Sequence, residues 1–223
     1  MKSRLTVRQA DSTFVETVTH WTIGSEGGTL AAPDGCWDLV VLKQHGQTNV
    51  LLTGQTTRTV SLPFVPGDEI MTISFKASAF LSFVPPTDLL DRGVLLSTTN
   101  HSFQLASDVF EIPTFENAEE FVKSLLKKEQ LRQDEVVEEA LLDHLPAYSL
   151  RLIQRRFLRA TGMTQNYFRQ IQRARQAAAL LQSGMPATEV AFETGYSDQP
   201  HMSRSLKRIL GRTPSEITAM TTL

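Results

Sequence analysis

Apolar residues in the last third of the chain recur at the spacing of amphipathic helices. The first stripe consists of Ala187, Val190 and Ala191, and the second of Met202, Leu206, Ile209 and Leu210. Gly195 between them suits the left-handed conformation that ends a helix. Ser197 and Asp198 are both suited to cap the next helix, and Pro200 fits its first turn. The pattern predicts a helix-turn-helix whose second helix lies in the DNA major groove.

Four further helices are predicted upstream of this unit, over residues 116–128, 133–144, 150–160 and 165–182. The third begins after Ser149, which is suited to cap it, and ends at Gly162. The fourth has one apolar face, formed by Tyr167, Ile171, Ala174, Ala178 and Leu181. At 1.5 Å per residue it spans roughly 27 Å, whereas one DNA turn is about 34 Å. We therefore expect this helix to hold two recognition helices over successive segments of the major groove.

The first 113 residues or so read mainly as short strands separated by Gly, Pro and Asp turns. Alternating patterns predict strands over residues 13–20, 37–42, 49–52, 57–62 and 69–75. Residues 77–84 fit a short helix or a buried strand, and residues 88–90 fit one helical turn. Regular short strands indicate a small barrel or sandwich. We expect its inward faces, such as Trp37 and Leu39 or Phe75, to line a pocket.

Charge divides the chain in the same way. Residues 149–223 contain eleven Lys and Arg against four Asp and Glu, whereas residues 1–148 contain eleven against twenty. A basic C-terminal part indicates a polyanionic partner, and an acidic N-terminal part does not suit DNA. The single cysteine, Cys36, excludes an internal disulfide framework and fits a reducing cytoplasm. We expect neither a secretory signal nor a membrane span.

The stretch GYSDQPHMSRSLKRILGRTPSEI closely resembles the second helix-turn-helix of AraC-type transcription regulators. The resemblance rests on Gly195-Tyr196, the capping turn of residues 197–199, the recognition-helix residues 204–207, and the Gly-x-x-Pro ending of residues 211–214. Residues 150–164 resemble the first recognition helix of that family, through Arg156-Phe157 and Thr161-Gly162. The stretch between Glu139 and Ser149 is shorter than usual and contains Pro146, which puts the docking of the first unit in doubt.

The blocks PDGCWDLVV and PGDEIMTISFK resemble more weakly the cupin-like sensor domain of one AraC-type subgroup. The fold class is therefore α+β, with an N-terminal β-barrel or sandwich and an all-α C-terminal part that holds two helix-turn-helix units joined by a long helix. We predict a β-rich sensor over residues 1–114, a linker helix over residues 115–132 and a DNA-binding domain over residues 133–223. The linker helix is a candidate for carrying a signal, with a purely structural role as the alternative.

Base readout is assigned to the solvent faces of the two recognition helices. The candidates are Arg151, Gln154 and Arg155 in the first helix and Gln199, His201, Ser203 and Arg204 in the second. Arginine matches guanine O6 and N7, and glutamine matches adenine N6 and N7. Some of these residues are expected to contact only phosphate, since that is where most protein–DNA hydrogen bonds go. The phosphate candidates are Lys207, Arg208, Arg169 and Arg173, while Tyr196 and Phe157 are expected in the core.

Enzymatic signatures are weak. The sequence has no paired His or Cys spacing for a metal and no nucleophile-elbow or phosphate-loop string. His20, His45 and His101 are three separate turn or surface positions unless the fold brings them together as metal ligands. Asp34 is assigned to a turn, whereas Asp38 fits a turn or a ligand site equally. Cys36 is read as a small buried side chain, because neighbouring acids raise its pKa.

Two functional classes remain. The first is a cytoplasmic, non-enzymatic transcription regulator without a cofactor or metal, which binds double-stranded DNA and responds to a small-molecule effector. The family resemblance also implies activation through RNA polymerase, and an oligomer is compatible with it. The second is a small-molecule-binding β domain whose helical part is a protein-interaction module. A steep loss of duplex affinity with rising salt distinguishes the first class from the second.

Overall fold

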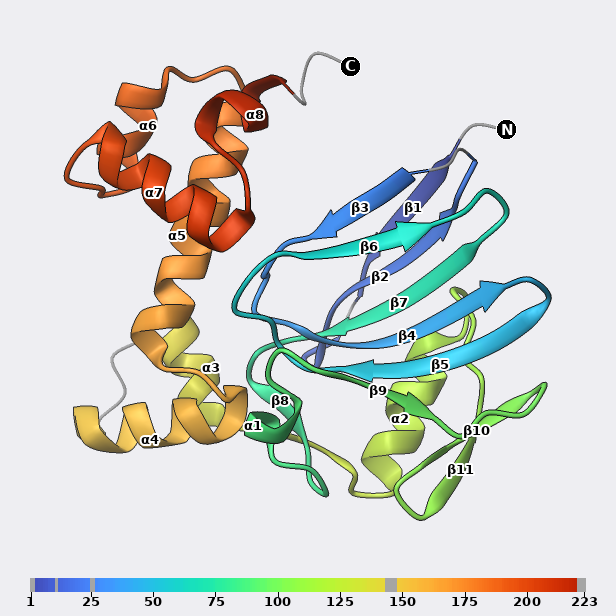
Figure 1. Ribbon diagram of the computed structural model, residues 1–223. Coiled ribbons are helices and arrows are strands. Elements are labelled where there is room, and N and C mark those ends of the chain that lie inside the picture. The colour runs from blue at the N-terminus through green and yellow to red at the C-terminus, as the bar shows by residue number, and fades with distance from the viewer. Residues whose placement is uncertain (1–2, 11, 25–26, 143–147, 220–223) are drawn as a thin grey trace.

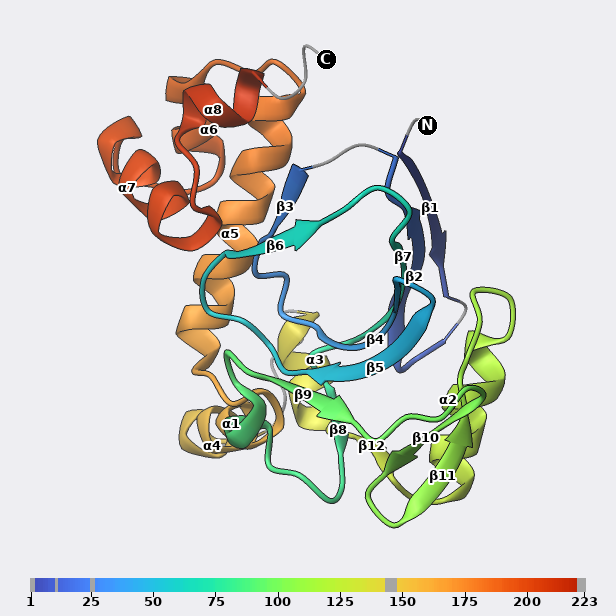
Figure 2. The same cartoon turned by 45° about the vertical axis from the view of Figure 1, so that its right-hand side comes forward.

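The computed structural model describes residues 3–10, 12–24, 27–142 and 148–219. The main sheet is antiparallel, with its strands in the order β1-β2-β7-β4-β5-β9. In chain order these are β1 (Arg4–Gln9), β2 (Val15–Thr22), β4 (Trp37–Gln44), β5 (Gln47–Thr53), β7 (Glu69–Phe75) and β9 (Gly93–Leu96). A second pair, β3 (Gly27–Ala31) and β6 (Val60–Phe64), closes over the sheet, and the strands curl into an open barrel (Figure 1, Figure 2).

The sheet buries alternate residues, as its sequence pattern requires. In β4, Trp37, Leu39 and Val41 are buried, while the residues between them are half-buried. Trp37 stacks on Phe75 of β7 with ring centroids 3.9 Å apart, and its indole nitrogen donates a 2.7 Å hydrogen bond to the Ala79 carbonyl oxygen. Leu39 and Phe75 are almost fully buried and act as packing residues, whereas Trp37 also lines a small cavity; the predicted pocket stays a prediction.

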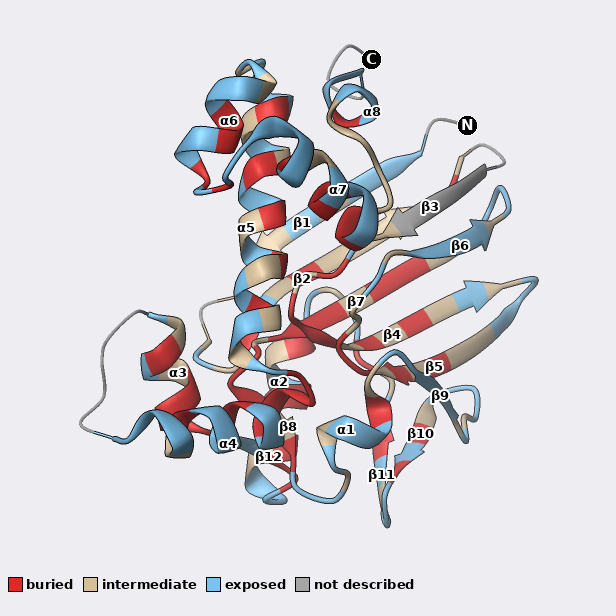
Figure 3. Ribbon diagram, turned by 60° about the vertical axis from the view of Figure 1, so that its left-hand side comes forward, coloured by how far each residue is buried: buried red, intermediate tan, exposed pale blue. Residues whose placement is uncertain are grey.

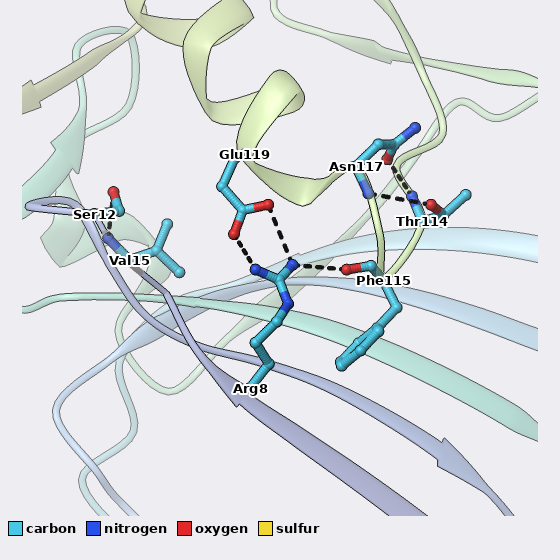
Figure 4. A network of polar contacts seen from close by, with 7 residues as sticks. All are labelled: Arg8, Ser12, Val15, Thr114, Phe115, Asn117 and Glu119. Atoms are coloured by element: carbon cyan, nitrogen blue, oxygen red, sulfur yellow. Dashed lines mark hydrogen bonds and ion pairs between the residues drawn. The ribbon is translucent and has the colours of Figure 1, made fainter.

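Helix α2 (Ala118–Lys127) covers the side of the sheet opposite β3 and β6 (Figure 1). Its Phe121 packs against Phe103 of β10 (Ser102–Leu105) and Phe110 of β11 (Asp108–Glu111), with ring centroids 5.8 and 5.5 Å apart. Arg8 of β1 pairs with Glu119 and donates a 2.7 Å hydrogen bond to the Phe115 carbonyl oxygen (Figure 4). The helix predicted as a linker therefore packs into the core of the β-rich part. The division into three segments stays a prediction.

Several strands differ from the sequence prediction. Residues 77–84 contain the short strand β8 (Ala79–Leu81), which pairs with β12 (Leu131–Gln133), so the helical alternative is wrong there. The strand predicted at residues 57–62 begins later, at Val60, because residues 54–59 form a loop. Strands β1, β3, β9, β10 and β11 lie where no strand was predicted. The short helix α1 (Pro86–Leu89) largely overlaps the turn expected at residues 88–90.

The C-terminal part is helical. Its elements are α3 (Glu135–Leu141), α4 (Leu150–Thr161), α5 (Gln165–Gln182), α6 (Ala187–Glu193), α7 (Gln199–Leu210) and α8 (Pro214–Ala219). Figure 1 shows α5 as one continuous helix with α4 at its lower end and α6 to α8 at its upper end. The α+β class, with two helix-turn-helix units on one long helix, is confirmed. Pro146 and the shortened lead-in around it fall largely on residues 143–147, outside the described residues.

The face that α5 buries is shifted from the predicted one. Phe168 and Ala177 are buried together with Ile171, Ala174 and Leu181, whereas Tyr167 and Ala178 are only half-buried. Figure 3 shows this buried stripe running along the helix between exposed turns. The reason for the shift at Tyr167 is a contact with the β-rich part, in which its hydroxyl donates a 2.6 Å hydrogen bond to the Thr57 carbonyl oxygen.

Candidate nucleic-acid interface

Helix α4 presents an exposed basic face because its two ends and its buried side are firmly fixed. The Ser149 hydroxyl accepts a hydrogen bond from the Leu152 amide at the N-terminus, and Gly162 ends the helix at φ 74°. Ile153 and Phe157 are buried beneath it. The exposed positions of α4, pale blue in Figure 3, are mostly polar, and Leu150 and Leu158 are the exposed apolar residues among them.

Three predicted base-reading residues lie together on that face. Arg151, Gln154 and Arg155 are exposed, and their side chains make no hydrogen bond or ion pair with the described part of the chain. They line an open groove of about 1160 Å³ between α4 and the start of α5. Asn166 of α5 lines the same groove and was missed, although the Thr164 cap preceding it marks a helix start beside α4.

Arg156, the neighbour of Arg155, has a different role. Its guanidinium lies 3.2 Å from the Asp134 carboxylate, and Asp134 caps the N-terminus of α3 by accepting a hydrogen bond from the Val137 amide. The Asp134 side chain is only 5% exposed. A buried carboxylate requires such a partner, so Arg156 joins α4 to α3 rather than facing DNA.

Helix α7 is the corresponding element of the second unit. The Asp198 carboxylate accepts a 2.6 Å hydrogen bond from the His201 amide, Pro200 lies in the first turn, and Gly211 ends the helix at φ 70°. Met202 and Leu206 are fully buried. Tyr196 in the preceding turn is buried as predicted, and its hydroxyl bonds the Ser205 hydroxyl at 3.2 Å.

The predicted readers on α7 are not equally available. Gln199 and Arg204 are exposed and make no side-chain hydrogen bond or ion pair with described residues. The ring of His201 packs edge-on against Tyr196, and its Nδ1 lies 3.0 Å from the Ser197 hydroxyl. The Ser203 hydroxyl donates to the Gln199 carbonyl oxygen at 2.9 Å. His201 and Ser203 therefore already have partners in their own helix and turn, while Gln199 and Arg204 project freely.

The predicted phosphate contacts also differ from one another. Lys207 lies 3.4 Å from the Glu216 carboxylate, with both side chains more than half exposed, which is a weak surface pair. Arg208 donates a 2.8 Å hydrogen bond to the Gln170 amide oxygen. Arg173 stacks over the Tyr196 ring, 5.5 Å from its centroid, and its guanidinium lies 3.5 Å from the Gly195 carbonyl oxygen. Arg173 thus supports the turn of the second unit. All these site assignments remain predictions.

The β-rich part contacts this helical unit through the turn at Asp34, for which the sequence predicts only a turn-capping role. Asp34 caps the turn, with its carboxylate accepting a 2.8 Å hydrogen bond from the Cys36 amide, as expected. Its carbonyl oxygen accepts hydrogen bonds from Gln172 and Arg175 of α5, at 3.1 and 3.0 Å. Asp34 and Gln172 are 138 positions apart, and nothing in the sequence around either residue indicates that they meet. This contact becomes visible only in the three-dimensional structure.

Burial raises the pKa values of Cys36 and Asp38, which lie in and just after this turn. Cys36 is a buried free thiol whose pKa is raised by desolvation and then by Asp34 and Asp38, which agrees with an unreactive packing role. Burial, with Asp34 nearby, raises the pKa of Asp38 to about 7, and the Oδ1 atom of Asp38 is buried without a hydrogen-bond partner. Among the described residues, no group of three or more His, Cys, Asp or Glu side chains is arranged to hold a metal.

Comparisons with known proteins agree with the geometry of the helical part. Residues 146–220 match the family model of a helix-turn-helix domain. The chain is 38% identical over 61 residues, 27% of its length, to the uncharacterized HTH-type transcriptional regulator YbfI of Bacillus subtilis. That match spans 22% of the relative, so the chain covers under a quarter of its length.

Solved structures of ToxT from Vibrio cholerae resemble the chain loosely over nearly its whole length. The apo form of a ToxT variant gives 12% identity and a TM-score of 0.48, over 96% of this chain and all of that one. Wild-type ToxT with an unsaturated fatty acid gives 11% identity and a TM-score of 0.40, over 98% and 95%. In the part of the chain that the structure describes, no helix has the length and apolar character needed to cross a membrane. The family match thus identifies residues 146–220 as a helix-turn-helix domain, the kind of domain with which transcription regulators bind DNA.

Proposed function

We propose that the chain is a sequence-specific DNA-binding transcription regulator that reads two successive segments of the major groove. The observation that carries the proposal is the pair of capped helices, α4 and α7, whose exposed polar faces lie at opposite ends of the single helix α5 (Figure 1). Helix α5 has 18 residues, which corresponds to roughly 27 Å at 1.5 Å per residue. That length suits two helices placed about one DNA turn apart.

Four side chains are the strongest candidates for base contacts because they are exposed and unpaired within the described chain: Arg151, Gln154, Arg155 and Arg204. Gln199 joins them at the start of α7. Arginine and glutamine have the geometry to pair with guanine and adenine in the major groove. His201 and Ser203 are weaker candidates, since their side chains first have to leave partners that they already hold.

The proposal includes a response to a small-molecule effector through the β-rich part. Its support is the set of hydrogen bonds that join the two parts: Tyr167 to Thr57, Thr59 to Ile209, and Gln172 and Arg175 to Asp34. An effector changes DNA affinity only if it binds two arrangements of this junction unequally. Such a regulator acts in the cytoplasm, contacts RNA polymerase, has no enzymatic activity and needs no cofactor. Self-association is compatible with it.

The test is selection of a preferred duplex from a random pool by the full chain, followed by anisotropy titrations of that duplex and a scrambled one. We expect a preference of at least about 10³ at physiological salt, and an affinity that falls steeply as salt rises. Equal affinity for both duplexes would refute sequence-specific binding. Absence of binding to either duplex at low salt would instead favour a protein-interaction role for the helical part.

A further inference from the structure

Three arginine side chains converge on one groove between the β-rich part and α4. Arg132 comes from β12, whereas Arg156 and Arg159 come from the C-terminal half of α4, beside which β8 and β12 lie (Figure 3). The groove has a volume of about 480 Å³. Charges of one sign that line a groove raise the local concentration of ions of the opposite sign. The groove is therefore suited to an anion.

The packing of the strand pair places Arg132 on the side that faces α4. Arg132 lies directly opposite Phe80 in the antiparallel pair of β12 and β8, so the two side chains share one face. Phe80 packs against the helical core that contains Phe157. Leu131 and Leu81, on the other face, belong to the core of the β-rich part. The position of Arg132 thus follows from the alternation of two short strands between two cores.

Among the described residues that line the groove, one carboxylate offsets these cations. Asp134 pairs with Arg156 at 3.2 Å. Arg132 and Arg159 are exposed, and neither side chain makes a hydrogen bond or ion pair with the described part of the chain. Three guanidinium groups and one carboxylate leave the lining with a net charge of +2. A phosphate monoester carries about −1.5 to −2 charges at pH 7 and balances this lining, whereas each phosphate of DNA carries a single negative charge.

Helix α3 disfavours an extended polyanion at this groove. It begins at Glu135, directly after Asp134, and both Glu135 and Glu139 are exposed. These like charges repel a DNA strand, which presents many phosphates, more than they repel one compact phosphate group. The charges around the groove therefore favour a small ligand over the DNA backbone.

A second groove adjoins the first and offers room for the rest of such a ligand. It is open, has a volume of about 590 Å³, and shares Phe80, Ser82 and Arg159 with the first groove. Its lining includes Phe83 and Leu158, which are 39% and 45% exposed. Apolar side chains left exposed beside a cluster of cations suit a ligand with a charged head and an apolar ring.

We propose that the three arginines bind the phosphate group of a small phosphate monoester whose apolar ring lies against Phe83 and Leu158. The planar fork of a guanidinium matches two phosphate oxygens through parallel hydrogen bonds. The bound phosphate links β12 to α4 and so joins the β-rich part to the first recognition helix. Binding changes DNA affinity only if the ester binds two arrangements of this junction unequally. Only this last consequence rests on the proposed DNA-binding function.

The test uses phenyl phosphate as the probe and phenyl sulfate, which has nearly the same shape and a single negative charge, as its matched control. Calorimetry with the full chain, without DNA and at constant ionic strength, measures both affinities at about pH 7.5, where the monoester is a dianion. We expect phenyl phosphate to bind the wild type at least about tenfold more tightly than phenyl sulfate, because its second charge strengthens the hydrogen bonds from unpaired guanidinium groups.

Three substitutions locate the site. Arg132→Met and Arg159→Met should each weaken phenyl phosphate binding at least about tenfold, because each removes a charged hydrogen-bond donor. Lys123→Met removes an exposed cation of α2 that does not line the groove, and it should change the affinity by less than about twofold. All three residues are exposed, so circular dichroism and cooperative melting should show folded proteins.

Three results would overturn the proposal: no binding of phenyl phosphate to the wild type, equal affinities for phenyl phosphate and phenyl sulfate, or equal weakening by Lys123→Met and the two groove variants. Duplex titrations of the same proteins form a separate arm. If Arg132→Met weakens duplex binding while the wild type does not bind phenyl phosphate, the groove serves the DNA backbone and the proposal is wrong. Phenyl phosphate binding without any duplex binding would refute the regulator function and leave the site in place.

Discussion

The hydroxyl of Thr59 donates a 3.0 Å hydrogen bond to the carbonyl oxygen of Ile209, although the two residues are 150 positions apart in the chain. Ile209 lies in the last turn of α7, where carbonyl oxygens have no partner within the helix. A loop of the β-rich part thus gives the carbonyl oxygen of Ile209 its hydrogen-bond partner. Any coupling between the two parts needs a direct contact of this kind.

Removing this hydroxyl should loosen the junction. Thr59→Val keeps the shape of the side chain and removes the donor, so we expect the free energy of unfolding to fall by about 0.5–1.5 kcal/mol. Tyr167→Phe removes the donor to Thr57 in the same junction and should have a loss of similar size. Urea denaturation of each variant measures the change. Stabilities equal to the wild type in both variants would show that these hydrogen bonds do not hold the two parts together.

A glycine pair tests the close approach of the turn at Asp34 to α5. Gly35 has φ 85°, and an added Cβ would lie 2.2 Å from Cε2 of Phe168. Gly46 has φ 78°, but nothing lies within 4 Å of its added Cβ. Gly46→Ala should therefore cost only the left-handed backbone penalty, about 1 kcal/mol, whereas Gly35→Ala should cost clearly more because a ring has to move. Equal losses in urea denaturation would place Phe168 away from the turn.

Two adjacent arginines should separate stability from DNA binding. Arg156→Met leaves the buried Asp134 carboxylate without its cation, and because Arg156 itself is 46% exposed, we expect the free energy of unfolding to fall by about 1–3 kcal/mol. Arg155→Met removes an exposed side chain and should leave stability unchanged within about 0.5 kcal/mol. Anisotropy titrations should rank the two variants the other way round for DNA binding. Arg155→Met should lose duplex affinity although it stays folded, and Arg156→Met should lose less. A stability loss of the same size in both variants would contradict this division of roles.

Asp38 should make stability depend on pH. Burial, with Asp34 nearby, raises its pKa to about 7, against about 3.9 in an unfolded chain. The folded state holds this proton more tightly, so its contribution is fully present below about pH 4 and is lost as the pH rises to about 7, at up to about 1.4 kcal/mol per pH unit. Asp38→Asn should abolish that decline, as urea denaturation at several pH values would show. A variant that keeps the full decline would assign it to another group.

The sequence was most informative where local chemistry decides the structure. Asp198 and Pro200 mark the start of α7 through capping and backbone preferences, the family resemblance implies its end at Gly211, and the structure confirms both ends. The sequence pattern predicts a strand over residues 57–62, whereas residues 54–59 form a loop. The loop's partners Tyr167 and Ile209 lie more than 100 residues away, so the local pattern could not indicate them. The roles of Arg156 and Arg173 were likewise hidden, since one basic residue in a helix pattern looks like another until its partner is placed.

The central claim is that α7 reads base pairs through Arg204, and matched titrations of two variants test it most directly. Arg204→Ala and Lys207→Ala are each measured at one salt concentration against the selected duplex and a scrambled one. We expect Arg204→Ala to cost about 1–3 kcal/mol on the selected duplex and little on the scrambled one, while Lys207→Ala weakens both duplexes alike. Equal losses on both duplexes for Arg204→Ala would contradict the account.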